Sequence, residues 1–213
     1  MEPKNESNTR ERILDAAEQI FATRGVDGAS MRAITALAKV NLSVVYYYFK
    51  DKEALLFAVF DRHVKPLLDR QFEILKQARE LAGAAPIPPR RLAEAMILPH
   101  AECVSETVHR LFTMILLRSG ELERRVFKSL EGAAQQLRDC FLREFGKTFP
   151  ELSSVEINFR IESVRAMLAG WTTIAPFKKG TYPKEVTQEH FFEMFIAIVL
   201  EMFNAPPTLS LKS

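Results

Sequence analysis

The amino-acid sequence predicts an all-α protein, on three observations. Only 8 of the 213 residues are Gly, in a chain with frequent Ala, Leu and Glu, and this composition favours helix. Apolar residues recur at helical spacing along much of the chain, and no run alternates like a strand between hairpin signals. With 47% hydrophobic and 26% charged residues, the chain is expected to fold as one large or two small globular domains.

The N-terminal part of the chain predicts a helix-turn-helix. Apolar residues recur at helical spacing over residues 9–24, and Gly25 is expected to end that helix. Ser30 is expected to cap a short second helix and Asn41 a third, which runs to about Phe49. Two short helices joined by so tight a turn, with the first helix packed across both, are typical of this motif. The second helix is expected to turn three apolar side chains inward: Met31, Ile34 and Leu37.

The rest of the chain predicts longer helices separated by Gly and Pro. Asp51 is expected to cap a long helix in which Pro66 causes a kink or a restart, and a loop follows over residues 82–89. Further helices are predicted over residues 90–118, as one helix or as two divided near Pro99, and over residues 121–145, 153–175 and 187–204. Gly146 and Pro150 are expected to close the helix over residues 121–145. The last helix is apolar on nearly all sides, so we expect it to be buried on two sides.

Positive charge is concentrated between residues 30 and 52. The whole chain has 29 Lys and Arg against 27 Asp and Glu, a net charge of +2, whereas this segment alone has a net charge of +3. Its four cations stand against Asp51, its one acid: Arg32, Lys39, Lys50 and Lys52. A nearly neutral chain does not belong to the proteins that coat nucleic acid through bulk charge, so any nucleic-acid binding must be local.

The third short helix has the side chains that a helix in a DNA major groove needs. Such a helix offers polar groups to base edges, hydroxyls and cations to phosphates, and apolar residues to the core. Three side chains are expected to face inward: Val40, Val45 and Phe49. Five others carry polar tips: Asn41, Ser43, Tyr46, Tyr47 and Tyr48. Three consecutive tyrosines on a helix point in three directions, so at least one phenol must be exposed to solvent and able to donate to a phosphate. For Tyr46, packing between helices is an equal alternative.

The run from Thr9 to Phe60 resembles the DNA-binding domain of the TetR family of transcriptional regulators. Four pieces in fixed order carry the resemblance: the run ILDAAEQIFATRG, Ser30 with Ile34, Ala38 with Val40, and the run YYYFKDKEAL. The runs VNLSVVYYYF and KEALLFAVFDRHVKPL also resemble a subgroup that includes fatty-acid-responsive repressors.

The resemblance implies a ligand-responsive regulator, a repressor, that acts as an all-helical homodimer. Residues 1–52 are expected to form the helix-turn-helix domain, with residues 1–8 flexible, and residues 53–213 the effector-binding and dimerisation domain. The implied partners are double-stranded operator DNA with an inverted repeat and a small effector, acyl or otherwise apolar, that releases the repressor. The helices over residues 153–175 and 187–204 are expected to build the dimer contact, because the last helix has apolar surface left over.

The resemblance also implies which residues meet DNA. Ser43, Val44, Tyr47 and Tyr48 correspond to groove and backbone contacts of the family, and Ser30 and Lys52 to phosphate contacts at helix N-termini. Together with the neighbouring polar side chains, the candidate DNA-binding residues are Ser30, Arg32, Asn41, Ser43, Val44, Tyr46, Tyr47, Tyr48 and Lys52.

Two departures from the family pattern affect this prediction. Lys39 stands at the turn position where the family usually has Gly, and a positive φ there would cost a lysine about 1 kcal/mol. Leu42 and Val44 replace polar residues that the family often uses for base contacts, so hydrogen-bond readout is expected to be sparse. Apolar contact with thymine methyl groups can partly replace it.

The C-terminal part of the chain contains soft and aromatic side chains that form a core by default and can also line an apolar pocket. The candidate effector-binding residues are Met96, Phe112, Met114, Arg118, Phe141, Arg165 and Trp171. Arg118 and Arg165 lie in largely apolar helical surroundings, where an unpaired guanidinium is costly. Each is expected to pair either with a ligand carboxylate or with an acid of the chain, such as Glu121 or Glu162.

Two alternative functions use other residues. In a redox sensor, the signal would be oxidation of Cys103 or Cys140, with Arg138 or Arg143 favouring the thiolate of Cys140. In a metal-dependent helical-bundle enzyme, the pair Glu106 and His109, or the pair His100 and Cys103, would supply ligands. Neither pair has the further ligands that such a site needs, and no nucleophile elbow, Walker loop or dinucleotide fingerprint is present. We therefore expect no metal, no cofactor and no enzymatic activity.

The sequence favours a cytoplasmic protein without a membrane segment. Residues 1–9 are polar and charged, unlike a secretory signal, and the apolar stretch over residues 191–203 is interrupted by two acids and too short to span a bilayer. Two cysteines are too few for a secreted disulfide scaffold.

Overall fold

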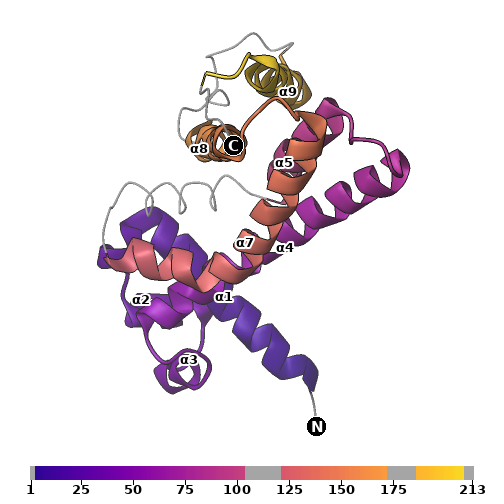
Figure 1. Ribbon diagram of the computed structural model, residues 1–213. Coiled ribbons are helices and arrows are strands. Elements are labelled where there is room, and N and C mark those ends of the chain that lie inside the picture. Colours follow the sequence, from indigo (N-terminus) through magenta and orange to yellow (C-terminus); the bar gives the residue numbers. More distant parts are fainter. Residues whose placement is uncertain (1–2, 104–120, 172–185, 209–213) are drawn as a thin grey trace. The chain divides into compact units, whose positions relative to one another are not determined.

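The computed structural model describes residues 3–103, 121–171 and 186–208, and all regular structure in these residues is helical (Figure 1). The helices are α1 (Pro3–Gly28), α2 (Met31–Ala38), α3 (Leu42–Tyr48), α4 (Lys52–Ala82), α5 (Pro89–Cys103), α7 (Glu121–Thr148), α8 (Ser154–Trp171) and α9 (Gln188–Asn204). The predicted all-α class is confirmed. Among these helices, none combines the length and the hydropathy that crossing a bilayer requires.

The chain divides into two compact units, each with its own apolar core. The first unit holds the residues up to Lys65 and the part of α7 that ends at Leu130. The second begins at Pro66 within α4 and resumes at Glu131 within α7. Both α4 and α7 therefore contribute residues to each unit.

The core of the first unit is built by α1, α2, α3 and the start of α4. Its largest fully buried side chains are Ile13, Leu14, Phe21, Ile34, Leu55 and Leu56. On α2, Ile34 is buried and Met31 is partly buried, as predicted, but the inward position predicted for Leu37 is wrong. Leu37 is 42% exposed, because Thr35 and Ala38 occupy the helix face that continues from Ile34.

The predicted helix ends of the first unit are mostly correct. The Ser30 hydroxyl accepts a hydrogen bond from the Ala33 N–H at 3.2 Å, and the Asp51 carboxylate accepts one from the Ala54 N–H at 2.8 Å. Asn41 is the N-cap residue of α3, but its side chain makes no capping hydrogen bond. Helix α1 begins at residue 3 rather than at residue 9, and its regular geometry is interrupted at Gly25 (φ 71°, ψ 170°), where the sequence predicts its end.

An ionic cluster joins α1 to α4 within the first unit. The Arg62 guanidinium pairs with Asp15 at 2.7 Å and with Glu18 at 2.9 Å. The His63 ring bonds the same Glu18 carboxylate at 2.7 Å. This hydrogen bond is the main reason why the pKa of Glu18 is lowered, and the charge of Arg62 adds to it, against the effect of burial.

Neither long helix is divided at its proline. Helix α4 continues through Pro66 without the restart that was one expectation, and α5 continues through Pro99 to Cys103, as one of its two alternatives predicts. Proline removes one backbone hydrogen bond, but packing outweighs that loss, because α4 buries Val64 and Leu67 on either side of Pro66 and Pro99 is itself buried beside the core residues of α5. Near Pro99, the buried Gln71 amide also donates to the carbonyl of Met96 at 2.9 Å. Helix α7 passes Gly146 and ends at Thr148, before Pro150, the second residue expected to close it.

Helix α7 continues past Gly146 because the turn after it is held from two sides. The Thr148 hydroxyl donates to the carbonyl oxygen of Ile87 at 2.9 Å and lies 3.0 Å from that of Glu144. Phe149 then packs into the core, with its ring stacked on that of Phe145. The helix therefore ends at Thr148.

The core of the second unit is formed by α5, α8, α9 and the parts of α4 and α7 that belong to it. The apolar residues that recur at helical spacing in α8 face the core, and four of them are buried: Ile157, Ile161, Val164 and Leu168. Thr187 caps α9 in a reciprocal pair of hydrogen bonds with His190, as the predicted start requires. One apolar face of α9 is buried, whereas Met194 and Ile198 on another face are 47% and 53% exposed.

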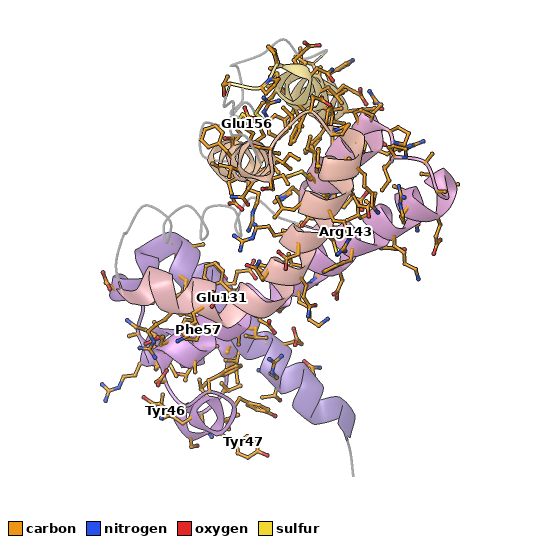
Figure 2. All side chains as sticks on the ribbon, in the orientation of Figure 1. Tyr46, Tyr47, Phe57, Glu131, Arg143 and Glu156 are labelled. Atoms are coloured by element: carbon orange, nitrogen blue, oxygen red, sulfur yellow. The ribbon has the colours of Figure 1, made fainter. Side chains whose placement is uncertain are left out.

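Arg160 ties α8 to the end of α9. It is 6% exposed and donates to the carbonyl oxygens of four residues at 2.8–3.3 Å: Met202, Phe203, Ala205 and Pro206. On the same face of α8, the buried Glu156 (labelled in Figure 2) accepts a hydrogen bond from the Thr208 N–H at 2.6 Å. The carbonyl groups that every helix C-terminus leaves without helical partners are thus satisfied by a buried cation.

The turn between α2 and α3 is set by Lys39. Its φ of 54° and ψ of 47° are left-handed, its N–H bonds the carbonyl of Ala36, and the N–H of Val40 bonds that of Thr35. This pair of bonds defines a Schellman motif, in which glycine is the usual left-handed residue. The Arg12 guanidinium reinforces the turn by donating to the carbonyl oxygens of Ala38 and Lys39 at 2.7 and 3.1 Å.

Replacing Lys39 by glycine is expected to raise the free energy of unfolding by up to about 1 kcal/mol, because glycine adopts this backbone conformation without strain. Urea denaturation measures the change. Lys39→Gln is the control, because it removes the charge and keeps the strain. Equal stabilities of the two variants would show that the lysine backbone is not strained.

Candidate nucleic-acid interface

Helix α3 is held against the first unit by a few inward side chains. Val45 is fully buried, Phe49 is 5% exposed directly after the helix, and Val40 packs partly buried against the same core. The inward positions predicted for these three residues are confirmed. A helix of seven residues is too short to be stable alone, so this packing determines where its outer face lies.

The outer face of α3 is polar and aromatic. Tyr47 is 74% and Tyr46 50% exposed, and Figure 2 shows both side chains on α3 at the outer edge of the unit. Asn41 and Ser43 are exposed beside them. The packing alternative for Tyr46 is therefore not what the structure shows.

Two of the candidate DNA-binding residues on α3 are half-buried. Val44 and Tyr48 pack against the core of the unit. The Tyr48 ring meets Tyr47 edge to face, with ring centroids 5.1 Å apart. Tyr48 therefore supports the more exposed Tyr47 from the inner side.

Cations surround this face. Arg32 on α2, Lys39 in the turn and Lys50 after α3 are all exposed. Lys52 is different, because it is half-buried and its ammonium group donates to the carbonyl oxygens of Val26 and Ala29 at 2.7 and 3.1 Å. Two of its three N–H donors thus hold the loop that leads into α2.

The arrangement is suited to double-stranded DNA. Seven helical residues span about 10 Å at 1.5 Å per residue, which is close to the width of about 12 Å of the major groove. Exposed hydroxyl and amide groups lie along α3, and cations lie near both of its ends. Such a surface can contact base edges and the phosphates that flank them.

Comparison with known proteins agrees with this geometry. A sequence model described as "Bacterial regulatory proteins, tetR family" matches residues 13–59. The transcriptional repressor NicS of Pseudomonas putida is 42% identical over 53 residues, which is 25% of this chain and 25% of NicS. The regulator UidR of Escherichia coli is 26% identical over 160 residues, 68% of this chain and 72% of UidR. Residues 13–59 are thus similar to the TetR family of bacterial regulatory proteins.

The sequence similarity to curated relatives covers only part of their length. It spans between a quarter and a little over a third of the length of NicS and two further curated regulators. The crystal structure of FadR from Bacillus subtilis, in complex with stearoyl-CoA, has a TM-score of 0.67 and 18% identity, and covers 91% of this chain and 96% of FadR. This likeness extends the shared fold to the second unit. NicS is named a transcriptional repressor, and UidR and FadR are named transcriptional regulators.

The candidate effector residues divide between described and undescribed positions. Met96 and Phe141 are 2% and 3% exposed and belong to the core of the second unit. Arg165 is instead exposed on α8 and pairs with Glu162 at 3.5 Å, so the acid of the chain is its partner. Phe112, Met114 and Arg118 lie outside the described residues, as does the side chain of Trp171.

The structure adds little support for a redox sensor or a metal-dependent enzyme. Cys140 is a half-buried free thiol whose sulfur lies 3.2 Å from a guanidinium nitrogen of Arg143, whereas Arg138 bonds Gln135. The pair Glu106 and His109 and the side chain of Cys103 lie outside the described residues. Within the part of the chain that the structure describes, three or more His, Cys, Asp or Glu side chains nowhere gather as they would around a metal ion.

Tyr47→Ala is expected to weaken DNA binding about tenfold without changing the free energy of unfolding, because the exposed phenol contributes a phosphate contact and no core packing. Lys52→Ala is expected to lower both the affinity for DNA and the free energy of unfolding, since the Lys52 ammonium group also holds the loop before α2. Fluorescence anisotropy and urea denaturation separate the two effects. Leu81→Ala, at an exposed position of the second unit, is the control, and wild-type affinity of both test variants would contradict the assignment.

Proposed function

We propose that this chain is a cytoplasmic transcriptional repressor that binds an inverted-repeat operator as a homodimer and is released by a small apolar effector. The observation that carries the proposal is α3, which buries Val45 and presents Tyr46 and Tyr47 to solvent among exposed cations. A surface of this chemistry has no evident use within the chain itself. Its dimensions suit the major groove.

The proposed DNA contacts follow from the chemistry of each side chain. The residues are Ser30, Arg32, Asn41, Ser43, Val44, Tyr46, Tyr47, Tyr48 and Lys52. Asn41 and Ser43 offer hydrogen bonds to base edges, and Tyr47 offers its phenol to a phosphate. Lys52 keeps one N–H donor for a phosphate beside the loop that it holds.

The dimer is proposed to form through α8 and α9. Each helix has two large apolar side chains, four residues apart and thus on one helix face, that are about half exposed or more. They are Val155 (54%) and Phe159 (72%) on α8, and Met194 (47%) and Ile198 (53%) on α9. A second copy of the same surface would cover them in a two-fold contact. Burial of α9 on its second side would then come from the partner subunit.

A dimer is also what specific DNA binding requires. One helix of seven residues reads too few base pairs to single out a site in a genome. Two copies related by a two-fold axis read two half-sites, about one helical turn apart, and the operator then has the same symmetry.

Phe159→Glu is expected to weaken self-association by at least about a hundredfold, because each dimer loses two buried rings worth about 1.5–3 kcal/mol each. Sedimentation and light scattering at micromolar concentration measure the association state. The control is Leu81→Glu, which puts the same charge on an apolar position that is 83% exposed on α4, away from the proposed contact. A wild-type chain that is monomeric at this concentration would refute the proposal.

The effector is proposed to bind among the helices of the second unit that include Met96 and Phe141. Since α4 and α7 each run from one unit into the other, a ligand that shifts either helix can act on the first unit. It lowers DNA affinity only if it prefers a conformation in which the two copies of α3 no longer match the operator. The acyl-CoA ligand of FadR makes acyl-CoA thioesters the first compounds to test.

Reciprocity provides the test of the inducer. Operator DNA is expected to weaken binding of the true effector by the same factor by which the effector weakens DNA binding. Thermal-shift screening, starting with acyl-CoA thioesters, selects the compound, and calorimetry with and without operator measures the factor. Equal affinity in both titrations would show that the compound binds without acting as inducer.

A further inference from the structure

Residues 8–12 of α1 lie outside the core of the first unit. None of their side chains is buried, whereas Ile13 directly after them is fully buried. Figure 1 shows this end of α1 projecting beyond the other helices of the unit. Two arginines lie on this segment, Arg10 and Arg12, and the structure gives them different contacts.

Arg12 has an internal role and Arg10 does not. The Arg12 guanidinium donates to the carbonyl oxygens of Ala38 and Lys39, so it is part of the turn before α3. The Arg10 guanidinium lies 5.7 Å from the centroid of the Phe49 ring, which directly follows α3. Its side chain remains 45% exposed.

The Phe49 ring places the Arg10 charge at the C-terminal end of the outer face of α3. A row of aromatic rings leads from there to the most exposed tyrosine. The Tyr48 and Phe49 centroids are 6.3 Å apart, and those of Tyr47 and Tyr48 are 5.1 Å apart. A guanidinium over an aromatic face keeps its N–H donors directed outward in the plane of the group.

The ion pair between Arg10 and Glu11 leaves the Arg10 guanidinium able to bind another anion. It bonds one oxygen of Glu11 at 3.2 Å, between side chains that are 45% and 49% exposed, and an exposed pair of neighbours contributes little and is screened by salt. Glu11 also pairs with Arg62 at 3.4 Å, so two arginines share this acid. A guanidinium has five N–H donors, and most of those of Arg10 remain for another acceptor.

We propose that Arg10 binds a backbone phosphate of the operator beside the C-terminal end of α3, so that the DNA-contacting surface extends from α3 onto α1. This inference rests on the proposed function. Lys50, exposed directly after Phe49, adds a second cation at the same end. Since α3 is nearly as long as the major groove is wide, cations at its two ends can meet phosphates on both sides of the groove.

The salt dependence of DNA binding tests this contact without knowledge of the operator. The probe is a random-sequence duplex of 30 base pairs, titrated by fluorescence anisotropy at several salt concentrations. Arg10→Ala is expected to lower the slope of log affinity against log salt by about 0.9 for each Arg10 that contacts the duplex, and so by nearly two for a dimer. Arg10→Lys keeps the charge and is expected to keep the slope.

The control is Arg91→Ala, which removes an arginine side chain that is 61% exposed in the second unit and is expected to leave the slope unchanged. A wild-type slope for Arg10→Ala would overturn the proposal. So would an equal loss in Arg10→Lys, because the ring contact rather than the charge would then matter. If the wild-type chain itself fails to bind duplex DNA, the proposed function fails, which is a different outcome.

Discussion

The proposed DNA-binding surface depends on the packing of one very short helix. Helix α3 has seven residues and cannot persist without tertiary support. The buried side chains of Val45 and Phe49 supply that support, and by fixing one face inward they decide that Tyr46 and Tyr47 point outward. The rest of the first unit keeps this face in place: Lys52 holds the loop before α2, and Arg12 holds the turn before α3.

In the second unit, too, inward contacts fix helices and leave their outer faces free. Arg160 is buried and satisfies the carbonyl groups at the end of α9, so α8 and α9 are fixed to each other independently of their outer faces. Those outer faces can therefore remain apolar and exposed, at Phe159 and Ile198 among others, and be available to a second copy. A rigid pair of helices suits a dimer contact because little conformational freedom is lost on association.

Local patterns were enough to predict many elements of this fold. The caps at Ser30 and Asp51, and the start of α9 near Thr187, depend on residues within a few positions of one another, and each is confirmed. The contacts that were missed join residues far apart in the sequence. Lys52 reaches back 26 residues to Val26, and the carbonyl partners of Arg160 lie 42–46 residues further along the chain. No spacing rule connects such residues.

Tertiary packing also decides how far α4, α5 and α7 continue. Proline and glycine weaken a helix locally, but core packing on both sides of Pro66 and Gly146, and the burial of Pro99 itself, outweigh that cost. The candidate site shows the same division. The exposure of Tyr46 and Tyr47 follows from helical spacing, whereas the position of Arg10 over Phe49 depends on how α1 crosses α3.

The outer face of α3 is proposed to lie in the major groove of an operator with two half-sites. An iron chelate that generates hydroxyl radicals, attached at Tyr47→Cys in a chain with Cys103→Ser and Cys140→Ser, tests it on a duplex selected from a random library. Cleavage is expected at two positions about one helical turn, or about 10 base pairs, apart. Cleavage spread evenly along the duplex, by a protein that still binds it, would show that α3 does not lie in the groove at two half-sites.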